Sequence, residues 1–238
     1  MRAFHSTFSQ STTKGCLFHF GQCLQRKLSE LGLKTLYCGN GAHADERYSS
    51  IRAWLRRCSV LSLLPPELVH PHWSISLKPS RPRIDGDPRI DGALDMYVEY
   101  FERQWLQNVD LWNFWDDADH IRTNNHVEGW HNSLRAKFHS SPHMSLSKFL
   151  VEYQCDVHNT NQVRIRQLLN GAPPNPRHPN YARNNMNIDD ARASFSWTYE
   201  SYSSGQMTLE APFTNIIEQF AHNINCYLQR VSYLLGTS

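Results

Sequence analysis

The chain has 238 residues, of which 40% are hydrophobic and 12% aromatic, enough apolar material for one large domain or two small ones. Its formal net charge is only +2 and its pI is about 8.2, so composition alone does not indicate a nucleic-acid-binding protein. No apolar run approaches the roughly 18 residues of a membrane span, and the first ten residues lack an apolar signal core. These features predict a protein of the nucleus or cytoplasm that is neither secreted nor held in a membrane.

Six cysteines lie at long, unequal spacings, which predicts reduced thiols rather than a disulfide framework. They are Cys16, Cys23, Cys38, Cys58, Cys155 and Cys226.

Residues 1–38 begin with a short amphipathic stretch, followed by an apolar run at Gly15–Phe20 that predicts a short strand. Leu24, Leu28 and Leu31 then recur at helical spacing up to Gly32. We therefore expect one strand and one amphipathic helix in this first segment.

Residues 39–119 are expected to be a helical region. Its first helix has an apolar face that includes Ile51 and Trp54 and carries three arginines, Arg52, Arg56 and Arg57. These arginines either contact phosphate or form a solvated helix face, and the sequence leaves both interpretations open. The later aromatic cluster at residues 112–115 is predicted to lie in the core rather than to stack on bases.

Within this region, residues 79–92 are predicted to form a loop. They contain Pro-Arg-Ile-Asp-Gly twice, at 82–86 and 88–92, and the stretch is rich in proline, glycine and charge. The repeated aspartates Asp85 and Asp91 are interpreted as loop residues, because a flexible loop holds metal ligands poorly.

Residues 120–170 contain the strongest local signal. Asn125 is a good N-cap and Glu128, three positions later, completes a capping box, so a helix should begin here. Its buried stripe is expected to contain Val127, His131, Leu134 and Phe138. Glu128 is either a capping residue or a metal-ligating acid fixed on a rigid element, and spacing alone does not decide between them.

The last part of the chain is predicted as two helices separated by a linker. A long helix from about Leu146 should pack on the Glu128 helix and end at Gly171. Residues 171–209 are rich in Pro, Asn, Ser and Arg, which favours a partly disordered linker. Residues 210–238 predict a helix whose apolar face needs a partner in this chain or in another.

The order of these motifs resembles the Mutator-like (MULE) transposases of eukaryotic mobile elements. The resemblance covers about residues 1–170 and is most specific in the Thr-Asn-Asn-x-x-Glu-Gly-x-His block at 123–131, together with a Cys-x-x-His motif at 16–19. It also includes Gly15–Gln22, Leu63–Pro65, Tyr100-Phe101 and Trp105-Leu106.

The resemblance implies an RNase H-like catalytic domain with two aspartates, a glutamate and a helical insertion before the glutamate. Glu128 matches the glutamate, Cys16 and His19 match the Cys-x-x-His motif, and Arg135 is placed to orient Glu128. In the intact family the acids hold Mg²⁺ or Mn²⁺ for DNA strand transfer. Cys16 and His19 are alternatively half of a zinc site with His126 or His131, or a buried thiol beside an ordinary histidine.

The sequence departs from this pattern where the aspartates belong, upstream of Gly15, because no aspartate precedes Asp45. We therefore expect a truncated transposase remnant, inactive alone and without a cofactor of its own. It is expected to be mainly α, the C-terminal portion of an RNase H-like domain with at most a short residual sheet. A working subunit that borrows aspartates from another chain is the second hypothesis.

Weak DNA contact is expected through six cations, and a domesticated DNA-binding or protein-interaction module, self-associating through 210–238, is the alternative function. The cations are Arg52, Arg56, Arg57, Arg122, Arg135 and Lys137.

Overall fold

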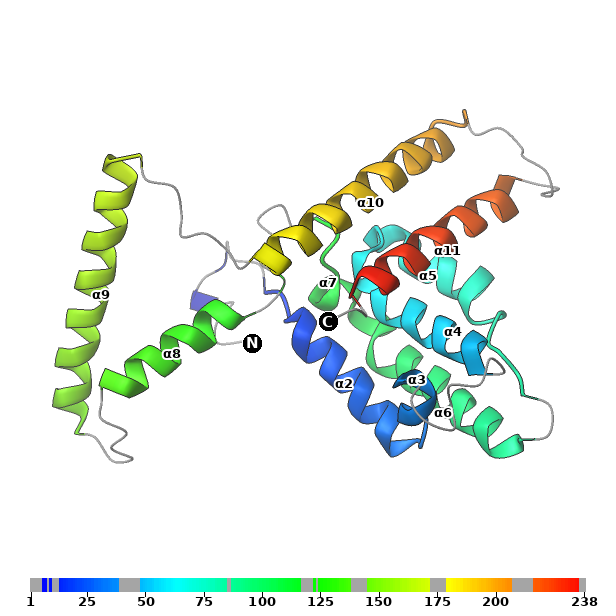
Figure 1. Cartoon of the computed structure of the whole chain (residues 1–238), viewed down its shortest axis with the longest axis horizontal. Coiled ribbons are helices and arrows are strands. Elements are labelled where there is room, and N and C mark those ends of the chain that lie inside the picture. The colour runs from blue at the N-terminus through cyan, green and yellow to red at the C-terminus, as the bar shows by residue number, and fades with distance from the viewer. Residues whose placement is uncertain are drawn as a thin grey trace. The chain divides into compact units, whose positions relative to one another are not determined.

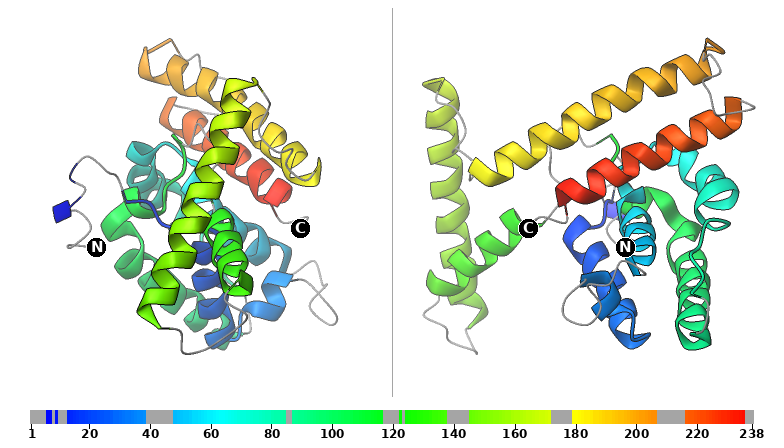
Figure 2. Two further views of the ribbon diagram at one scale, coloured as in Figure 1. Left: turned by 90° about the vertical axis from the view of Figure 1, so that its left-hand side faces the viewer. Right: turned by 45° about the vertical axis from the view of Figure 1, so that its right-hand side comes forward.

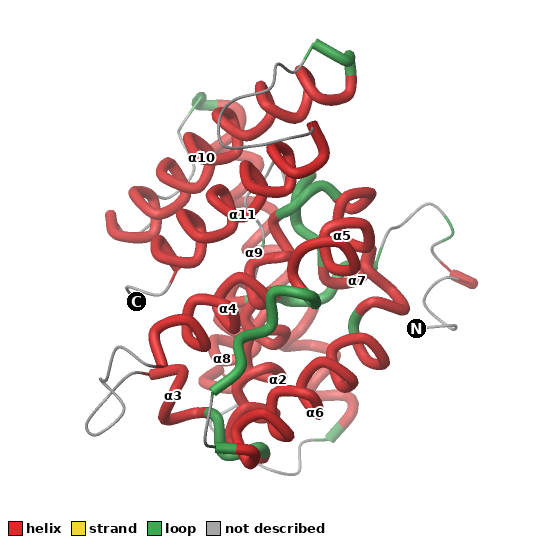
Figure 3. Tube along the Cα trace, turned by 90° about the vertical axis from the view of Figure 1, so that its right-hand side faces the viewer, coloured by secondary structure: helices red, strands yellow, loops and turns green. Residues whose placement is uncertain are grey.

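The structure, a computed structural model, describes residues 6–7, 9, 13–38, 48–84, 87–116, 122, 124–137, 145–171, 179–206 and 216–235. Every regular element in these ranges is a helix (Figure 1, Figure 3). The mainly α fold class is therefore confirmed, whereas the described residues contain no residual strand. The chain divides into two compact units, one of residues 1–122 and 183–238 and the other of residues 123–182.

The first unit holds most of the helices and the main hydrophobic core. In chain order its α-helices are α2 (Leu17–Glu30), α3 (Lys34–Cys38), α4 (Ser49–Val60), α5 (Pro66–His72), α6 (Pro88–Gln104), α7 (Val109–Trp112), α10 (Pro179–Ser203, in this unit from Arg183) and α11 (Ile216–Leu235). Short 3₁₀ turns at Leu61–Leu63 and Leu106–Asn108 and a π-helical turn at Trp73–Leu77 connect some of them.

Helix α2 replaces the strand predicted at Gly15–Phe20, and that prediction is wrong. Cys16 is the N-cap residue and has an extended backbone conformation, and the apolar run after it forms the first turn of the helix. Phe20, Leu24 and Leu28 are buried at intervals of four, so the run belongs to the same apolar stripe as the leucines that follow it. The predicted end of the helix at Gly32 is confirmed.

Gly32 ends α2 in a Schellman motif. Its φ is +72°, a conformation that favours glycine. The N–H of Leu33 donates to the carbonyl of Leu28 at 2.8 Å, and the N–H of Gly32 donates to that of Ser29 at 3.2 Å. Leu28 and Leu33 are both buried, as the motif's hydrophobic contact requires.

Gly15 lies where two backbone segments meet, and its replacement by alanine is expected to lower the free energy of unfolding by about 1 to 3 kcal/mol. The Gly15 N–H donates to the carbonyl oxygen of Leu111 at 2.6 Å, and an added Cβ would lie 2.9 Å from that same oxygen. Denaturant unfolding measures the loss. The matched control is Gly21→Ala within α2, where a Cβ meets nothing within 4 Å; it should stabilise the helix. Equal effects from the two changes would contradict the close approach at Gly15.

Tryptophans organise the core of the first unit, and the indole N–H groups of Trp54 and Trp112 donate to backbone carbonyls. Trp54 Nε1 donates to the carbonyl of Leu77 at 2.8 Å, and Trp112 Nε1 donates to that of Trp105 at 2.7 Å. The Trp112 ring stacks on Phe20 with centroids 4.9 Å apart. Residues 112–114 are buried, as predicted for the aromatic cluster.

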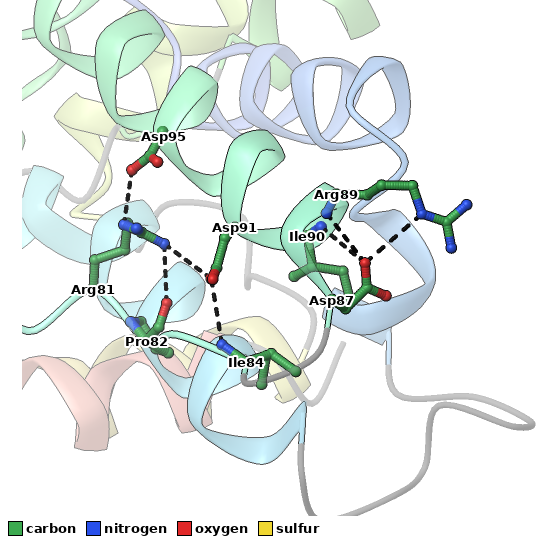
Figure 4. Close-up of polar contacts among 8 residues, drawn as sticks. All are labelled: Arg81, Pro82, Ile84, Asp87, Arg89, Ile90, Asp91 and Asp95. Atoms are coloured by element: carbon green, nitrogen blue, oxygen red, sulfur yellow. Dashed lines mark hydrogen bonds and ion pairs between the residues drawn. The ribbon is translucent and has the colours of Figure 1, made fainter.

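The two copies of Pro-Arg-Ile-Asp-Gly differ over their described residues, so the loop predicted at 79–92 is wrong from Pro88 on, Asp91 included, and Asp85 lies outside the described residues. Asp87 is the N-cap of α6, and its carboxylate accepts from the N–H groups of Arg89 and Ile90 (Figure 4). Pro88 takes the first helical position, where its missing N–H costs nothing. Asp91 then accepts from the Ile84 N–H at 3.3 Å, which holds Ile84 of the first copy against the helix.

Helices α10 and α11 lie side by side and run antiparallel (Figure 2). Phe195 of α10 stacks on Tyr227 of α11 with centroids 4.7 Å apart, and Tyr202 stacks on Phe220 at 3.9 Å. Residues 179–203 are therefore helical, and the linker predicted at 171–209 is wrong for them.

The apolar face of α11 is covered within the chain. It packs against α4, and the hydroxyl of Tyr227 donates to the carbonyl of Leu63 at 2.7 Å. Its buried residues are Gln219, Phe220, Ile224, Tyr227, Leu228 and Val231. Of the two partners expected for residues 210–238, the structure provides the one in this chain, so this face is not a free surface for self-association.

The second unit is a hairpin of α8 (Asn125–Lys137) and α9 (Leu146–Leu169). The predicted end of α9 is confirmed, because Asn170 is its C-cap and Gly171 follows with φ +61°. No helix within the described ranges is long and apolar enough to cross a membrane.

Candidate functional site

The start of α8 carries the block that contains Glu128. The helix begins at Asn125, and the carbonyl of Asn124 accepts the Glu128 N–H at 3.0 Å. The predicted helix start is confirmed, but the N-cap position falls on Asn124, one residue earlier than expected. The side chain of Asn125 lies outside the described residues.

Trp130 fixes α8 on α9. Its Nε1 donates to Asp156 Oδ2 at 2.8 Å, and its ring meets Tyr153 edge-on at 6.1 Å. Asp156 is only 5% exposed, so the indole N–H satisfies a carboxylate that the helix pair has removed from water. The predicted packing of α9 on the Glu128 helix is thus confirmed.

The buried stripe predicted for α8 is mostly wrong. Leu134 is buried, but Val127 is 50% exposed and His131 is also exposed. The physical reason is that a two-helix hairpin gives α8 one neighbouring helix, which covers only a narrow part of its circumference. Phe138 lies outside the described residues.

Glu128 and Arg135 are both exposed residues of α8. Seven residues separate them, which is about 10 Å of helical rise. Glu128 lies in the first turn, where a carboxylate also stabilises the helix dipole. The orientation of Glu128 by Arg135 stays a prediction.

Cys16 and His19 lie at the start of α2 in the first unit. Cys16 is partly buried and His19 is exposed, with its ring 5.5 Å from that of Phe18. The further zinc ligands considered, His126 and His131, belong to α8 in the second unit, and the His126 side chain is not described. Within the described part of the chain, no three His, Cys, Asp or Glu residues are grouped so that they could hold a metal ion.

The three arginines of α4 make contacts inside the first unit. Arg52 Nε donates to the carbonyl of Leu36 at 3.3 Å, and the Arg56 guanidinium lies 5.8 Å from the Tyr37 ring centroid. Arg57 donates to Asn225 Oδ1 of α11 at 2.9 Å, and burial lowers its pKa. The side chains are thus partly buried and tie α4 to α3 and α11.

Arg122 is a buried residue of the first unit, at 4% exposure. Its Nη2 lies 3.7 Å from Asp189 Oδ1 on α10, and its carbonyl accepts the Leu17 N–H at 2.7 Å. Arg192, also on α10, donates to the carbonyl of Phe114. Arg122 therefore joins the start of α2 to the middle of α10, and burial keeps it from a DNA surface. The side chain of Lys137 lies outside the described residues.

A partly buried polar cluster lies where α4, α5 and α11 meet, and no sequence pattern predicted it. Asn225 accepts from Arg57 and donates through Nδ2 to Ser76 Oγ at 2.8 Å. His72, only 3% exposed, has no partner of normal hydrogen-bond geometry at either ring nitrogen. Burial lowers the pKa of His72 to about 4, and this effect outweighs the favourable influence of Asn225.

Two surface features of the first unit were also missed. A pocket of about 520 Å³ is lined by the cations Lys78, Arg81 and Arg83. Arg81 Nε already pairs with Asp95 at 2.9 Å, and Lys78 pairs with Glu102 at 2.8 Å. The second feature is a histidine and a cysteine one turn apart on α11, His222 and Cys226. Their spacing of four residues was visible in the sequence as a helical pair.

Comparisons with protein-family models, with curated proteins and with solved structures found no match.

Proposed function

We propose that the chain is a derivative of a MULE-type transposase that contacts DNA without cutting it alone. The observation that carries the proposal is the position of Glu128, exposed in the first turn of a helix that Trp130 anchors to α9. A carboxylate on such a rigid element fits the last acid of the family's site. The resemblance of residues 123–131 supports the same assignment.

The proposed lack of cutting concerns the acids that residues 1–238 themselves supply. The two aspartates of the family belong upstream of Gly15, and residues 1–14 contain neither aspartate nor glutamate. Two-metal strand transfer depends on all the acids positioning charge together. Glu128 by itself supplies one ligand of such a set.

DNA contact is assigned to α8 rather than to α4. The arginines of α4 are engaged within the fold, whereas Arg135 is exposed, and Lys137 follows it in the last turn of α8. Cations on one exposed helix can bind successive phosphates.

Arg135→Gln is expected to weaken binding to duplex DNA uniformly across sequences and to reduce the salt slope of log K by about 1. The reason is the loss of one phosphate contact and of the counterion that it releases. Filter binding over a range of salt concentrations measures both quantities. Arg103→Gln, an exposed cation on α6, is the matched control and should change neither. Wild-type protein without salt-sensitive affinity would remove the DNA contact from the proposal.

Purified protein is expected to leave supercoiled DNA uncut with Mg²⁺ or Mn²⁺. Nicking that depends on the metal and disappears in Glu128→Gln would instead support the hypothesis of aspartates borrowed from a second chain. Gel electrophoresis of the plasmid distinguishes the two results. Glu99→Gln, an exposed carboxylate of α6, controls for the loss of a charge.

A second candidate function, self-association, is favoured by the exposed apolar residues of α9. They are Leu146, Phe149, Leu150, Val151, Tyr153, Val157, Val163, Ile165, Leu168 and Leu169. Two helices alone do not close a hydrophobic core, and a four-helix bundle made from two hairpins does.

We propose that a second copy of the chain covers this surface of α9. Leucines lie at both ends of α9, so an antiparallel pair centred near Val157 places Leu146 opposite Leu169. The same pairing brings Glu152 near Arg164 of the other copy. Such a two-fold arrangement matches one patch with itself.

Leu150→Glu is expected to convert a dimer into a monomer, because it places a charge in the apolar seam between the two α9 helices. Sedimentation equilibrium measures the mass. Met96→Glu, on α6 and similarly exposed at 51%, is the control and should leave the dimer intact. A wild-type protein that is monomeric at micromolar concentration would rule out this second function.

A further inference from the structure

Helix α11 presents a thiol and an imidazole together on its exposed side. The distance from Cys226 Sγ to His222 Nε2 is 3.3 Å, and both residues are exposed. The spacing of four residues places the two side chains one above the other. The opposite side of α11 is buried against α4 and α10, so the helix that carries the pair is held in place.

A hollow of about 200 Å³ lies beside the thiol, between α10 and α11. Its lining combines one cation, several hydrogen-bonding side chains and two aromatic rings. These residues are Ser194, Phe195 and Thr198 of α10 with Asn223, Cys226, Tyr227 and Arg230 of α11, and Ala191 completes the set. Arg230 lies one turn beyond Cys226, where a guanidinium can bind a carboxylate. The volume suits the carboxylate-bearing end of a ligand whose remainder lies in solvent, rather than a whole cofactor.

We propose that Cys226 is a redox modification site that takes a small carboxylate-bearing disulfide of the glutathione class. His222 accepts the proton of the thiol, because the thiolate is the nucleophile in such exchange. Sγ of Cys226 attacks one sulfur of the disulfide, a new S–S bond forms, and the old S–S bond breaks. The departing thiolate takes the proton from His222, so the thiol of Cys226 is oxidised and half of the disulfide is reduced. Arg230 holds a carboxylate of the disulfide during the exchange.

The other cysteines give an internal comparison. Cys58 is fully buried, whereas Cys38 and Cys155 are exposed like Cys226. Among the described contacts, the sulfur of Cys226 lies within hydrogen-bond distance of a histidine ring. Exposure alone therefore predicts equal rates for Cys38, Cys155 and Cys226, and the proposal predicts unequal ones.

The test is the rate of mixed-disulfide formation in the full chain at pH 7.5, followed at each cysteine by mass spectrometry of peptides. With glutathione disulfide, Cys226 should react about tenfold faster than Cys38 and Cys155. His222→Gln should bring its rate down to theirs. His158→Gln, an exposed histidine three residues from Cys155, is the matched control and should leave the rate at Cys226 unchanged.

A second reagent separates the role of Arg230 from that of His222. Arg230→Gln should slow the reaction of Cys226 with glutathione disulfide severalfold and leave its reaction with uncharged 2-hydroxyethyl disulfide unchanged. His222→Gln should slow both reactions. Equal rates at the three exposed cysteines would overturn the proposal. If Arg230→Gln slowed the reactions of Cys226 with both disulfides equally, the assignment of Arg230 to the carboxylate would be overturned. The readout does not depend on DNA contact or on self-association.

Discussion

Replacing Asn113 by leucine is expected to lower the free energy of unfolding by about 2 to 5 kcal/mol. The side chain is 1% exposed and joins two backbone segments. Its Nδ2 donates to the carbonyl of Leu64 at 2.7 Å, and its Oδ1 accepts the N–H of Trp115 at 2.9 Å. Leucine fills nearly the same space but leaves both backbone groups without this partner, and each such group costs about 1 to 3 kcal/mol when buried.

Urea denaturation followed by tryptophan fluorescence measures this loss, because all tryptophans except Trp130 belong to the first unit. The control is Asn108→Leu, at an exposed position of the turn before α7, which should change the midpoint little. A loss below about 1 kcal/mol for Asn113→Leu would mean that the two backbone groups find other partners.

Local signals in the sequence predicted the parts of the fold that depend on local geometry. Gly32 and Gly171 end α2 and α9 because a left-handed residue there costs least at glycine. Glu128 marked a helix start to within one residue. Each of these signals acts over a few residues, so a single sequence is enough to reveal it.

Helix α10 was missed because its apolar stripe is sparse and aromatic. Ile188, Ala191 and Phe195 are buried at helical spacing, and Tyr199 and Tyr202 continue the stripe. Serine and arginine lie between them and several asparagines come just before Ile188, and this composition favoured a linker. Periodicity was the better indicator here, because burial of one stripe needs only every third or fourth residue to be apolar.

Whether each arginine is buried or exposed could not be predicted from the sequence. Arg57 and Arg122 both lie next to apolar helices, as surface cations commonly do. In the fold, each pairs with a residue distant in sequence: Arg57 with Asn225 on α11, and Arg122 with Asp189 on α10. Such pairings depend on how the helices pack, so they follow from the fold and not from a local pattern.

His72→Phe is expected to remove a large pH dependence of stability. Burial lowers the pKa of His72 to about 4 in the folded state, from about 6.5 when unfolded. Above pH 6.5 both states are neutral at this residue and its contribution is fully present. As the pH falls, the unfolded chain takes up the proton first, so stability is lost progressively down to the folded pKa.

The loss from His72 between pH 7.5 and 4.5 amounts to about 2.5 kcal/mol. The groups facing the ring are Arg57 on α4, which stays protonated over this range, and Asn225 on α11, which does not ionise. Neither adds a titration of its own. Phenylalanine should be tolerated at neutral pH, because a hollow of about 70 Å³ beside His72 can take the larger ring. The difference between wild type and variant, measured by urea denaturation at pH 7.5, 5.5 and 4.5, isolates this one residue. His70→Phe, on the same helix but exposed, should retain the full pH dependence. Parallel curves of unfolding free energy against pH for wild type and His72→Phe would show that His72 titrates alike in the folded and unfolded states.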